Sequence, residues 1–336
     1  MQIREHTSIG TLFRSRVRAS DTADAYRVKS NGRWVSVNWR RMGADVTFTA
    51  AGLAQLGVNR GDGVAILGPT CPEWCQVDLA AMLLGAPVVG IYPTLPTDQV
   101  RYLLEDARCR VLAVHGAEDF ERCRPLLEQV AGLEHLVVWG HPPGPAENAV
   151  SLTALSERGR KTLKDDVGLV NDRLAQVSRQ DVALVLYSSG TTGQPKGVPL
   201  THHNLLSLLE IDDPMFDLPG PDDLSLSFLP MAHVAEHVVG FLARLRSGMP
   251  TAFATSYDTL LDELQEVRPT YFGSVPRIFE KLYGRIHEQV ARASPTRQAL
   301  FARARELALR RARAEHGGPH LGLRDHLALA AYDRLV

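Results

Sequence analysis

The chain has 336 residues, 45% of them hydrophobic and 22% charged, and its formal net charge is −1. These values are typical of a globular protein of about two domains, and they exclude a disordered chain and a strongly basic nucleic-acid-binding protein. The four cysteines form no CxxC pair, no signal-peptide core precedes Gly10 and no run of 18 apolar residues occurs, so we expect a cytoplasmic protein without a membrane span.

Short apolar strands alternate with helices in the first half of the chain. Strands are predicted at residues 64–67, 88–92, 111–114 and 136–139, and helices at residues 73–84 and 97–107. This alternation predicts an α/β fold with a doubly wound, mainly parallel sheet. A polar loop at residues 141–147 and a charged run at 156–180 then favour a boundary near residue 175, so we expect subdomains 1–175 and 176–336.

The second half continues the alternation. Strands of a second sheet are predicted at residues 182–187, 224–229, 251–254 and 270–273, with helices near residues 202–210, 233–246, 257–266 and 277–291. Thr201 is a suitable N-cap for the first of these helices, and His202 and His203 are interpreted as surface or capping groups.

The most informative stretch follows the strand at residues 182–187. Residues 187–198 read Tyr-Ser-Ser-Gly-Thr-Thr-Gly-Gln-Pro-Lys-Gly-Val. Glycines bring backbone N–H groups close to an anion, hydroxyls donate to phosphate oxygens, and the Lys196 ammonium offsets their charge. A Walker loop is excluded because Lys196 lies between Pro195 and Gly197, without a following hydroxyl. The alternative interpretation of such a Ser/Gly/Thr cluster is a flexible linker.

This stretch resembles the signature of the AMP-forming adenylate-forming enzymes, Tyr-Thr-Ser-Gly-Thr-Thr-Gly-x-Pro-Lys-Gly, with Ser188 in place of the first threonine. The family contains acyl-CoA synthetases, luciferases and peptide-synthetase adenylation domains. The resemblance implies that the loop grips the β- and γ-phosphates of ATP while a carboxylate attacks the α-phosphorus. The nucleotide contacts implied are Ser188, Ser189, Gly190, Thr191, Thr192, Gly193 and Lys196. Lys196 and Thr192 are then catalytic candidates, and Thr191 is a candidate ligand for Mg²⁺.

A second match narrows the branch of the family. Residues 229–237, Leu-Pro-Met-Ala-His-Val-Ala-Glu-His, resemble the Leu-Pro-Leu-x-His-x-x-Glu segment of long-chain acyl-CoA synthetases. The resemblance implies that His233 lines the acid pocket beside the reacting carboxylate, as a catalytic and substrate-binding residue. A packed histidine at a helix start is the alternative. Glu236 and His237 are adjacent and do not share a helix face, which argues against a metal pair.

Three shorter stretches resemble the same long-chain enzymes, at residues 72–74, 91–94 and 274–281. The last is equally explained as a strand-to-helix connection with proline at the first helical turn. Residues 294–316 form a further helix, with Ser294 as N-cap, Pro295 at the first position and arginines around an apolar face. This helix is a candidate for peripheral contact with anionic lipid, and a solvated helix packed on its own domain is the alternative.

Three features of a complete adenylating enzyme are missing from the sequence: a Tyr-Gly-x-Thr-Glu segment, a ribose-binding Thr-Gly-Asp and a C-terminal domain with a catalytic lysine. We therefore expect two doubly wound α/β subdomains of the acyl-CoA synthetase large domain, without the later β-barrel part and the C-terminal domain. The resemblance implies ATP-dependent activation of a long-chain fatty acid, with ATP and Mg²⁺ as cofactors and CoA as cosubstrate. The fragment alone is expected to be inactive.

Two alternatives stay open at this point. A fatty-acyl-AMP ligase that feeds a carrier protein adenylates its acid in the same way, and a catalytically incomplete remnant would bind nucleotide or acyl groups without turnover. Small molecules are the expected partners, and the length of the acid and the oligomeric state are left open.

Overall fold

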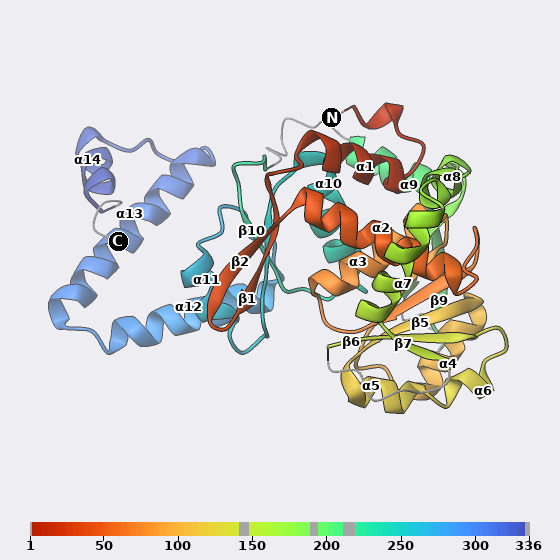
Figure 1. Ribbon diagram of the computed structural model, residues 1–336. Helices are drawn as coiled ribbons and strands as arrows, with labels where there is room; N and C mark the ends of the chain where they lie inside the picture. Colours follow the sequence, from red (N-terminus) through yellow and green to blue (C-terminus); the bar gives the residue numbers. More distant parts are fainter. Residues whose placement is uncertain (1, 141–147, 189–193, 211–218, 333–336) are drawn as a thin grey trace. The chain divides into compact units, whose positions relative to one another are not determined.

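The computed structural model describes residues 2–140, 148–188, 194–210 and 219–332 (Figure 1). The chain forms two compact units, residues 1–273 and 274–336. The predicted division into subdomains 1–175 and 176–336 therefore does not coincide with these units, and it stays a prediction.

The larger sheet has seven strands in the described part of the chain, in the order β7-β6-β5-β3-β4-β8-β9. Their bounds are β3 (Gly63–Leu67), β4 (Val88–Ile91), β5 (Cys109–His115), β6 (His135–Trp139), β7 (Ala149–Ser151), β8 (Val182–Ser188) and β9 (Lys196–Thr201). All neighbouring pairs are parallel except β8 and β9, which form an antiparallel hairpin. Parallel strands of this kind are buried on both faces, and β3 is buried throughout.

Successive residues of each strand enter two different apolar cores, because side chains alternate between the faces of a sheet. In β3, Val64 and Ile66 belong to the first core, whereas Ala65 and Leu67 belong to the second. The helices of the first core include α1 (Ile9–Ala19), α2 (Trp39–Gln55), α3 (Pro72–Leu83), α7 (Leu152–Asp165), α8 (Leu169–Ala175) and α9 (His202–Glu210). Those of the second are α4 (Thr97–Asp106), α5 (Gly116–Cys123) and α6 (Leu126–Gln129). In Figure 1, α2, α3 and α7 lie above the strands and α5 and α6 below them, so the predicted doubly wound α/β fold is confirmed.

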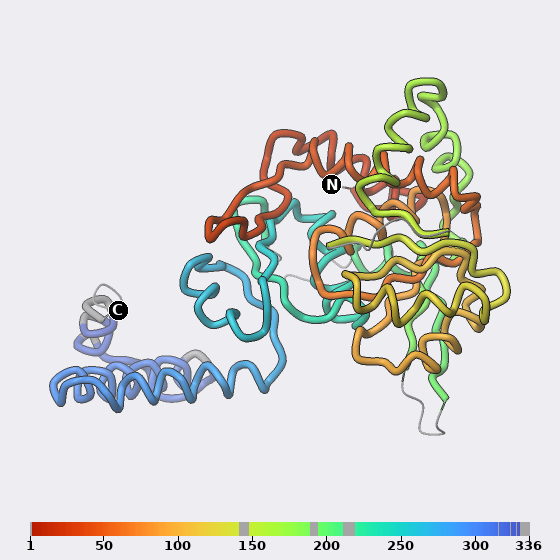
Figure 2. Tube along the Cα trace, turned by 60° about the horizontal axis from the view of Figure 1, so that its bottom comes forward, coloured from red at the N-terminus to blue at the C-terminus, as the bar shows by residue number. Residues whose placement is uncertain are grey.

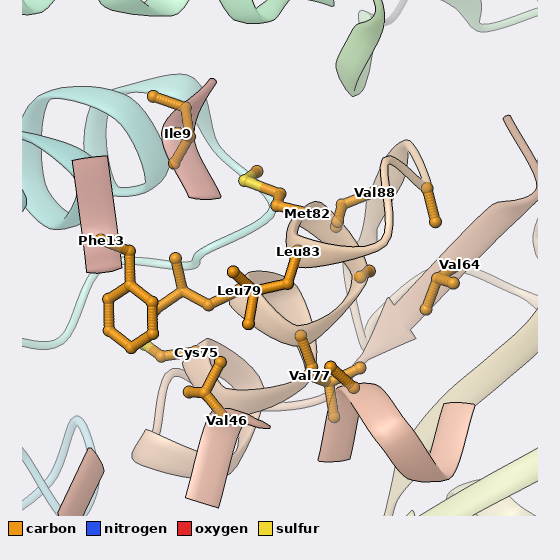
Figure 3. Close-up of a cluster of buried hydrophobic side chains, with 14 of the residues drawn as sticks. Ile9, Phe13, Val46, Val64, Cys75, Val77, Leu79, Met82, Leu83 and Val88 are labelled. Carbon is orange, nitrogen blue, oxygen red and sulfur yellow. The ribbon is translucent and has the colours of Figure 1, made fainter. Parts of the chain in front are cut away.

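Helix α3 is buried along most of its length. Its residues Cys75, Leu79 and Met82 lie with Ile9 and Phe13 of α1 in the first core (Figure 3). A helix that is apolar on nearly all sides belongs in an interior, and removing one such leucine typically costs about 2–5 kcal/mol of stability. The same helix also carries a fully buried carboxylate, Asp78.

A smaller sheet has four strands among the described residues, in the order β10-β11-β1-β2. Their bounds are β1 (Asp24–Ser30), β2 (Arg33–Asn38), β10 (Ser225–Ser227) and β11 (Thr251–Phe253). Figures 1 and 2 both show the red β1–β2 hairpin beside the blue-green strands, and β1 is parallel to β11. Shorter helical elements complete this unit: η1 (Ile3–Glu5), the π-helix η2 (Ala235–Leu242), α10 (Ala243–Ser247) and α11 (Leu260–Val267).

Two strand predictions were wrong, one in the neighbour of the strand and one in its existence. The strand at residues 182–187 was expected to open the second sheet, but β8 pairs with β4 in the larger sheet. Residues 270–273 were expected to form a strand, but there only Tyr271 pairs, as an isolated bridge to Ser225. Propensity and apolar runs indicate that a strand exists, whereas its neighbour depends on how the intervening helices cross the sheet.

The second unit contains α12 (Pro276–Ala291), α13 (Pro295–Glu315) and α14 (Leu323–Tyr332). Pro276 and Pro295 begin their helices, as predicted, and Ser294 occupies the N-cap position without a side-chain capping bond. No helix in the described ranges combines the length and the apolar character that a membrane crossing needs. Lipid contact of residues 294–316 stays a prediction.

Candidate active site

A cavity of about 720 Å³ lies where the larger sheet meets the segment that carries His233. Its walls come from β4, α4, the β8–β9 hairpin and residues 232–234, and most of them are apolar. The lining residues are Gly90, Tyr92, Leu95, Gln99, Leu103, Leu186, Tyr187, Ser188, Pro195, Val198, Leu200, Ala232, His233 and Val234. Open α/β sheets bind ligands at the carboxyl ends of their strands, and β4 and β8 both end at this cavity.

The cavity brings together two sequence motifs that were identified independently. Ser188 belongs to the glycine-rich stretch, and His233 belongs to the Leu-Pro-Met-Ala-His segment some 45 residues later. Lys196 pairs in register with Ser188 across the hairpin, and its side chain is exposed. The five other predicted nucleotide contacts, Ser189, Gly190, Thr191, Thr192 and Gly193, lie outside the described residues. Their roles, and that of Thr191 toward Mg²⁺, therefore stay predictions.

Both stems of the hairpin are tied to α4. The Tyr187 hydroxyl donates to Asp106 Oδ2 over 2.6 Å, and the Tyr102 hydroxyl donates to the Pro195 carbonyl over 3.2 Å. Burial and the Asp106 carboxylate raise the pKa of the Tyr187 phenol, so it remains a donor at neutral pH. These contacts were not predicted from the sequence. The available signal was the spacing of Tyr102 and Asp106, which are four residues apart and share one helix face.

The segment that carries His233 contacts the chain at the ends of two strands, β3 and β4. Thr70, just after β3, donates its hydroxyl to the Leu229 carbonyl over 2.6 Å and accepts the Met231 N–H over 3.1 Å. Gly90 of β4 permits a close approach, because a Cβ at this position would lie 2.9 Å from the Cα of Ala232. A larger residue at position 90 would push this segment away from the sheet.

The imidazole of His233 is exposed and lines the cavity. Its Nδ1 accepts the backbone N–H of Ala235 over 3.1 Å, and its carbonyl accepts the N–H groups of Glu236 and His237 over 3.1 and 3.0 Å. A neutral histidine that accepts at Nδ1 carries its proton on Nε2. Nε2–H is thus the donor that His233 can offer to a carboxylate. The ring is exposed, not packed as the alternative interpretation had expected, and its role toward an acid stays a prediction.

Glu236 and His237 lie just behind His233 and are buried. Glu236 Oε1 lies 3.0 Å from Arg244 Nη2 and accepts the Ser227 hydroxyl, whereas His237 Nε2 lies 3.0 Å from Asp78 Oδ1. The two side chains therefore have separate partners. Within the described ranges, no cluster of three or more His, Cys, Asp or Glu residues could hold a metal ion.

The histidine pair at the start of α9 differs in part from the prediction. Thr201 caps this helix as expected, because its Oγ1 accepts the Asn204 N–H while Asn204 Oδ1 accepts the Thr201 N–H. His202 is fully buried, so of the two expected roles, surface or capping group, the first was wrong. Its Nδ1 accepts the N–H of Ile9, the first residue of α1, whose N-cap is Ser8. Burial lowers the pKa of His202 to about 4, and His203 is exposed.

A second cavity, of about 870 Å³, lies between α2, α7 and the end of β6. Although it is larger, it contains none of the predicted site residues. Its charged side chains are mostly paired with one another, Arg41 with Asp45 and Arg160 with Glu157, both at 2.8 Å. The smaller cavity is the better candidate, because the motif residues converge there.

Comparison with known proteins gives a consistent result. The family model described as AMP-binding enzyme matches residues 14–321. The long-chain-fatty-acid–CoA ligase FadD15 of Mycobacterium bovis is 32% identical over 337 aligned positions, which cover 99% of this chain and 54% of that protein. The long-chain-fatty-acid–CoA ligase ACSBG2 of Rattus norvegicus is 30% identical, with coverage of 90% and 46%. The chain thus spans about half the length of these curated relatives.

Solved structures show the same fold. A crystal structure described as a long-chain-fatty-acid CoA ligase from Rhodopseudomonas palustris matches with a TM-score of 0.66 at 19% identity, covering 87% of this chain and 67% of that one. The N-terminal domain of FACL13 from Mycobacterium tuberculosis matches with a TM-score of 0.62 at 25% identity, covering 82% and 64%. The match extends to the anthranilate CoA ligase AuaEII, solved with anthranoyl-AMP, at a TM-score of 0.69 and 23% identity, with coverage of 81% and 51%.

Proposed function

Because this chain belongs to the AMP-binding enzyme family, we propose that the protein carrying it activates a long-chain fatty acid with ATP and transfers the acyl group to CoA. The observation that carries this proposal is the single cavity shared by Ser188 of the glycine-rich stretch and His233 of the acid-pocket segment. The names of the relatives support the choice of a long-chain acid and of CoA.

The first step joins the acid to AMP. A carboxylate oxygen forms a bond to the α-phosphorus of ATP, the bond from that phosphorus to the bridging oxygen breaks, and pyrophosphate leaves with the bonding electrons. In the second step the sulfur of CoA forms a bond to the acyl carbon, AMP leaves, and the thiol proton passes to solvent. Both steps need alignment and charge stabilisation more than a protein nucleophile.

The residues at the cavity suit the first step. The Nε2–H of His233 can donate to one oxygen of the fatty acid carboxylate and leave the other oxygen directed at phosphorus. Ser188 and the ammonium of Lys196 stand at the two stems of the hairpin, where they can contact the leaving phosphates. The apolar walls, including Leu95, Leu103 and Leu186, suit the first methylenes of an acyl chain.

Mg²⁺ is the cation expected with ATP. It would neutralise phosphate charge when bound, and oxygen ligands such as a threonine hydroxyl and the phosphates suit it. Thr191 is the proposed protein ligand. The chain's own residues have the other roles in this proposal: the hairpin binds the phosphates, and His233 orients the acid.

Acid-dependent exchange of pyrophosphate into ATP tests the first step. The protein that carries this chain would be incubated with MgATP, labelled pyrophosphate and saturated acids of increasing length, and acyl-CoA would be assayed by mass spectrometry after CoA is added. We expect exchange with long acids and a CoA-dependent thioester. Exchange without formation of a thioester would favour a carrier protein as the acyl acceptor. If none of the acids supports exchange, the proposed activity is wrong.

A His233→Ala variant separates acid binding from ATP binding. Because the imidazole lies on a different segment from the hairpin, its loss should raise the KM for fatty acid about tenfold or lower kcat, with the KM for ATP nearly unchanged. His203→Ala, which removes an exposed histidine of α9, is the matched control. A His233→Ala variant that is defective only in saturation with ATP would contradict the assignment.

A further inference from the structure

A fully buried carboxylate lies close behind the proposed acid site. Asp78 belongs to α3, and both it and its neighbour His237 have no exposed surface. The ring of Trp74, from the same helix, also packs on His237 in a T-shaped arrangement, with centroids 5.0 Å apart. Although Asp78 Oδ1 and His237 Nε2 are only 3.0 Å apart, the ring N–H does not point straight at the oxygen, and neither group has another hydrogen-bond partner in the described chain.

Stability does not account for this pair. Moving a carboxylate out of water costs several kcal/mol, and replacing a buried polar pair by apolar residues of similar volume is often neutral or stabilising. The pair does depend on geometry, because the two groups are in contact over 3.0 Å and a rotation of η2 would separate them. A second buried contact, from Glu236 to Arg244, fixes the adjacent turn of the same helix. π-helical turns are rare and occur frequently at functional sites.

A short path of contacts leads from Asp78 to the cavity. The N–H groups of Glu236 and His237 both donate to the carbonyl of His233. The N–H of Ala235, one residue earlier, donates to the His233 imidazole and selects its tautomer. A shift of the turn at His237 would therefore move the carbonyl of His233 and the N–H that orients its ring.

We infer that Asp78 and His237 are positioning residues for His233. Through them the core helix α3 sets the direction in which Nε2–H meets a carboxylate. The inference rests on the proposed function for the identity of that carboxylate. It extends the site into the core, to a residue that contacts neither acid nor nucleotide.

The direct test is the state of the His233 ring in residues 1–336. Nitrogen-15 histidine spectra distinguish protonated from unprotonated ring nitrogens, and the His233 signals are assigned by their loss in His233→Ala. The wild-type chain should show an unprotonated Nδ1 and a protonated Nε2. In Asp78→Asn, which keeps the volume and removes the charge, we expect a mixture of both tautomers.

The kinetic test uses acid-dependent exchange in the protein that carries this chain. Asp78→Asn and His237→Gln should each raise the KM for acid about tenfold and change the KM for ATP less than about twofold. Glu263→Gln is the matched control, because Glu263 of α11 is also a buried carboxylate but accepts the N–H of Thr255, away from η2. The control should leave the His233 signals and both KM values unchanged.

An apolar replacement separates positioning from folding. Asp78→Leu/His237→Leu removes the pair without leaving a buried charge, so it should unfold at a temperature similar to that of the wild type and still lose the single His233 tautomer. If this variant and Asp78→Asn fold and keep both the wild-type tautomer and the wild-type KM for acid, the inference is wrong. It is also wrong if neither variant folds, since the pair is then a structural requirement. Exchange that never depends on acid would refute the proposed function, while the spectra would still decide the role of Asp78.

Discussion

The residue with the clearest proposed electrostatic role is Lys196, whose ammonium belongs to one stem of the hairpin. Its charge and the hydroxyl of Thr192 are expected to stabilise the phosphates as pyrophosphate leaves. Removing one preorganised contact of this kind typically costs about 2.7–4 kcal/mol of barrier, so Lys196→Ala and Thr192→Ala should each lower acid-dependent exchange about a hundredfold or more. Lys164→Ala, which removes an exposed lysine of α7, is the control. Near-normal exchange in both loop variants would exclude these residues from the mechanism.

His202 makes the stability of the chain depend on pH. Burial lowers its pKa to about 4 in the folded state, below the ordinary value of 6.5. The neutral ring accepts the N–H of Ile9 at Nδ1. Between these two values the unfolded chain binds more protons, so the contribution of His202 to stability is present above pH 6.5 and is lost as the pH falls toward 4. We expect a loss of about 2 kcal/mol between pH 7 and pH 5.

Urea unfolding at the two pH values measures this effect. The comparison is between the wild type and His202→Gln, which does not titrate in this range, with His203→Gln as the control on the exposed neighbour. The wild type and the control should lose about 2 kcal/mol more than His202→Gln. Equal losses in all three proteins would show that His202 titrates normally.

At the scale of elements, α4 holds the hairpin in place through two tyrosines. The Tyr102 hydroxyl bonds to the Pro195 carbonyl at one stem, and Asp106 accepts from Tyr187 at the other. A hydrogen bond of this kind contributes about 0.5–1.5 kcal/mol, so Tyr102→Phe should raise the KM for ATP by about twofold to tenfold and leave the KM for acid nearly unchanged. Tyr257→Phe, on an exposed ring, is the control. An increase in the KM for acid instead would place Tyr102 in the acid pocket.

Element types were largely predictable, and element neighbours were not. Apolar runs such as residues 64–67 and 111–114 predicted strands, because buried parallel strands require them, and proline at positions 276 and 295 predicted two helix starts. Nothing local indicated that β8 would pair with β4, some 90 residues earlier, or that β1 would pair with β11. Those neighbours follow from the path of the crossover helices, which depends on packing of the whole unit.

At the scale of the whole molecule, the sequence predicted the residues on two sides of the candidate site, but it did not predict the contacts that hold those residues in place. Ser188 and His233 were both identified from motifs, and the fold brings them to one cavity. Thr70, Tyr102 and Asp78 were missed because each acts through a contact with residues more than 90 positions away. Contacts between residues so far apart leave no pattern in a single sequence. A buried aspartate in α3, for example, cannot be distinguished by its sequence position from any other polar residue of a helix.

The division of the chain into residues 1–273 and 274–336 predicts which part folds by itself. Both apolar cores, both described sheets and the candidate cavity are formed by residues before Ser274. A fragment that ends at Gly273 should therefore unfold cooperatively, at a temperature within about 4 °C of the main transition of residues 1–336. A shift of this size corresponds to about 1 kcal/mol in the free energy of unfolding, which is the largest loss we expect from removing residues 274–336. Circular dichroism on heating measures both transitions.

A shorter fragment of residues 1–175 is the informative contrast, because it corresponds to the boundary predicted from the sequence. It lacks β8, which would leave one edge of β4 unpaired, and it lacks His202, which accepts the N–H of Ile9 at the start of α1. An uncovered parallel edge and a buried N–H that has lost its acceptor both cost stability, so this fragment should unfold at a much lower temperature or aggregate. If the 1–175 fragment is stable and the 1–273 fragment is unfolded, the prediction is wrong. That result would show that the first α/β subdomain, rather than the compact unit, is the part that folds by itself.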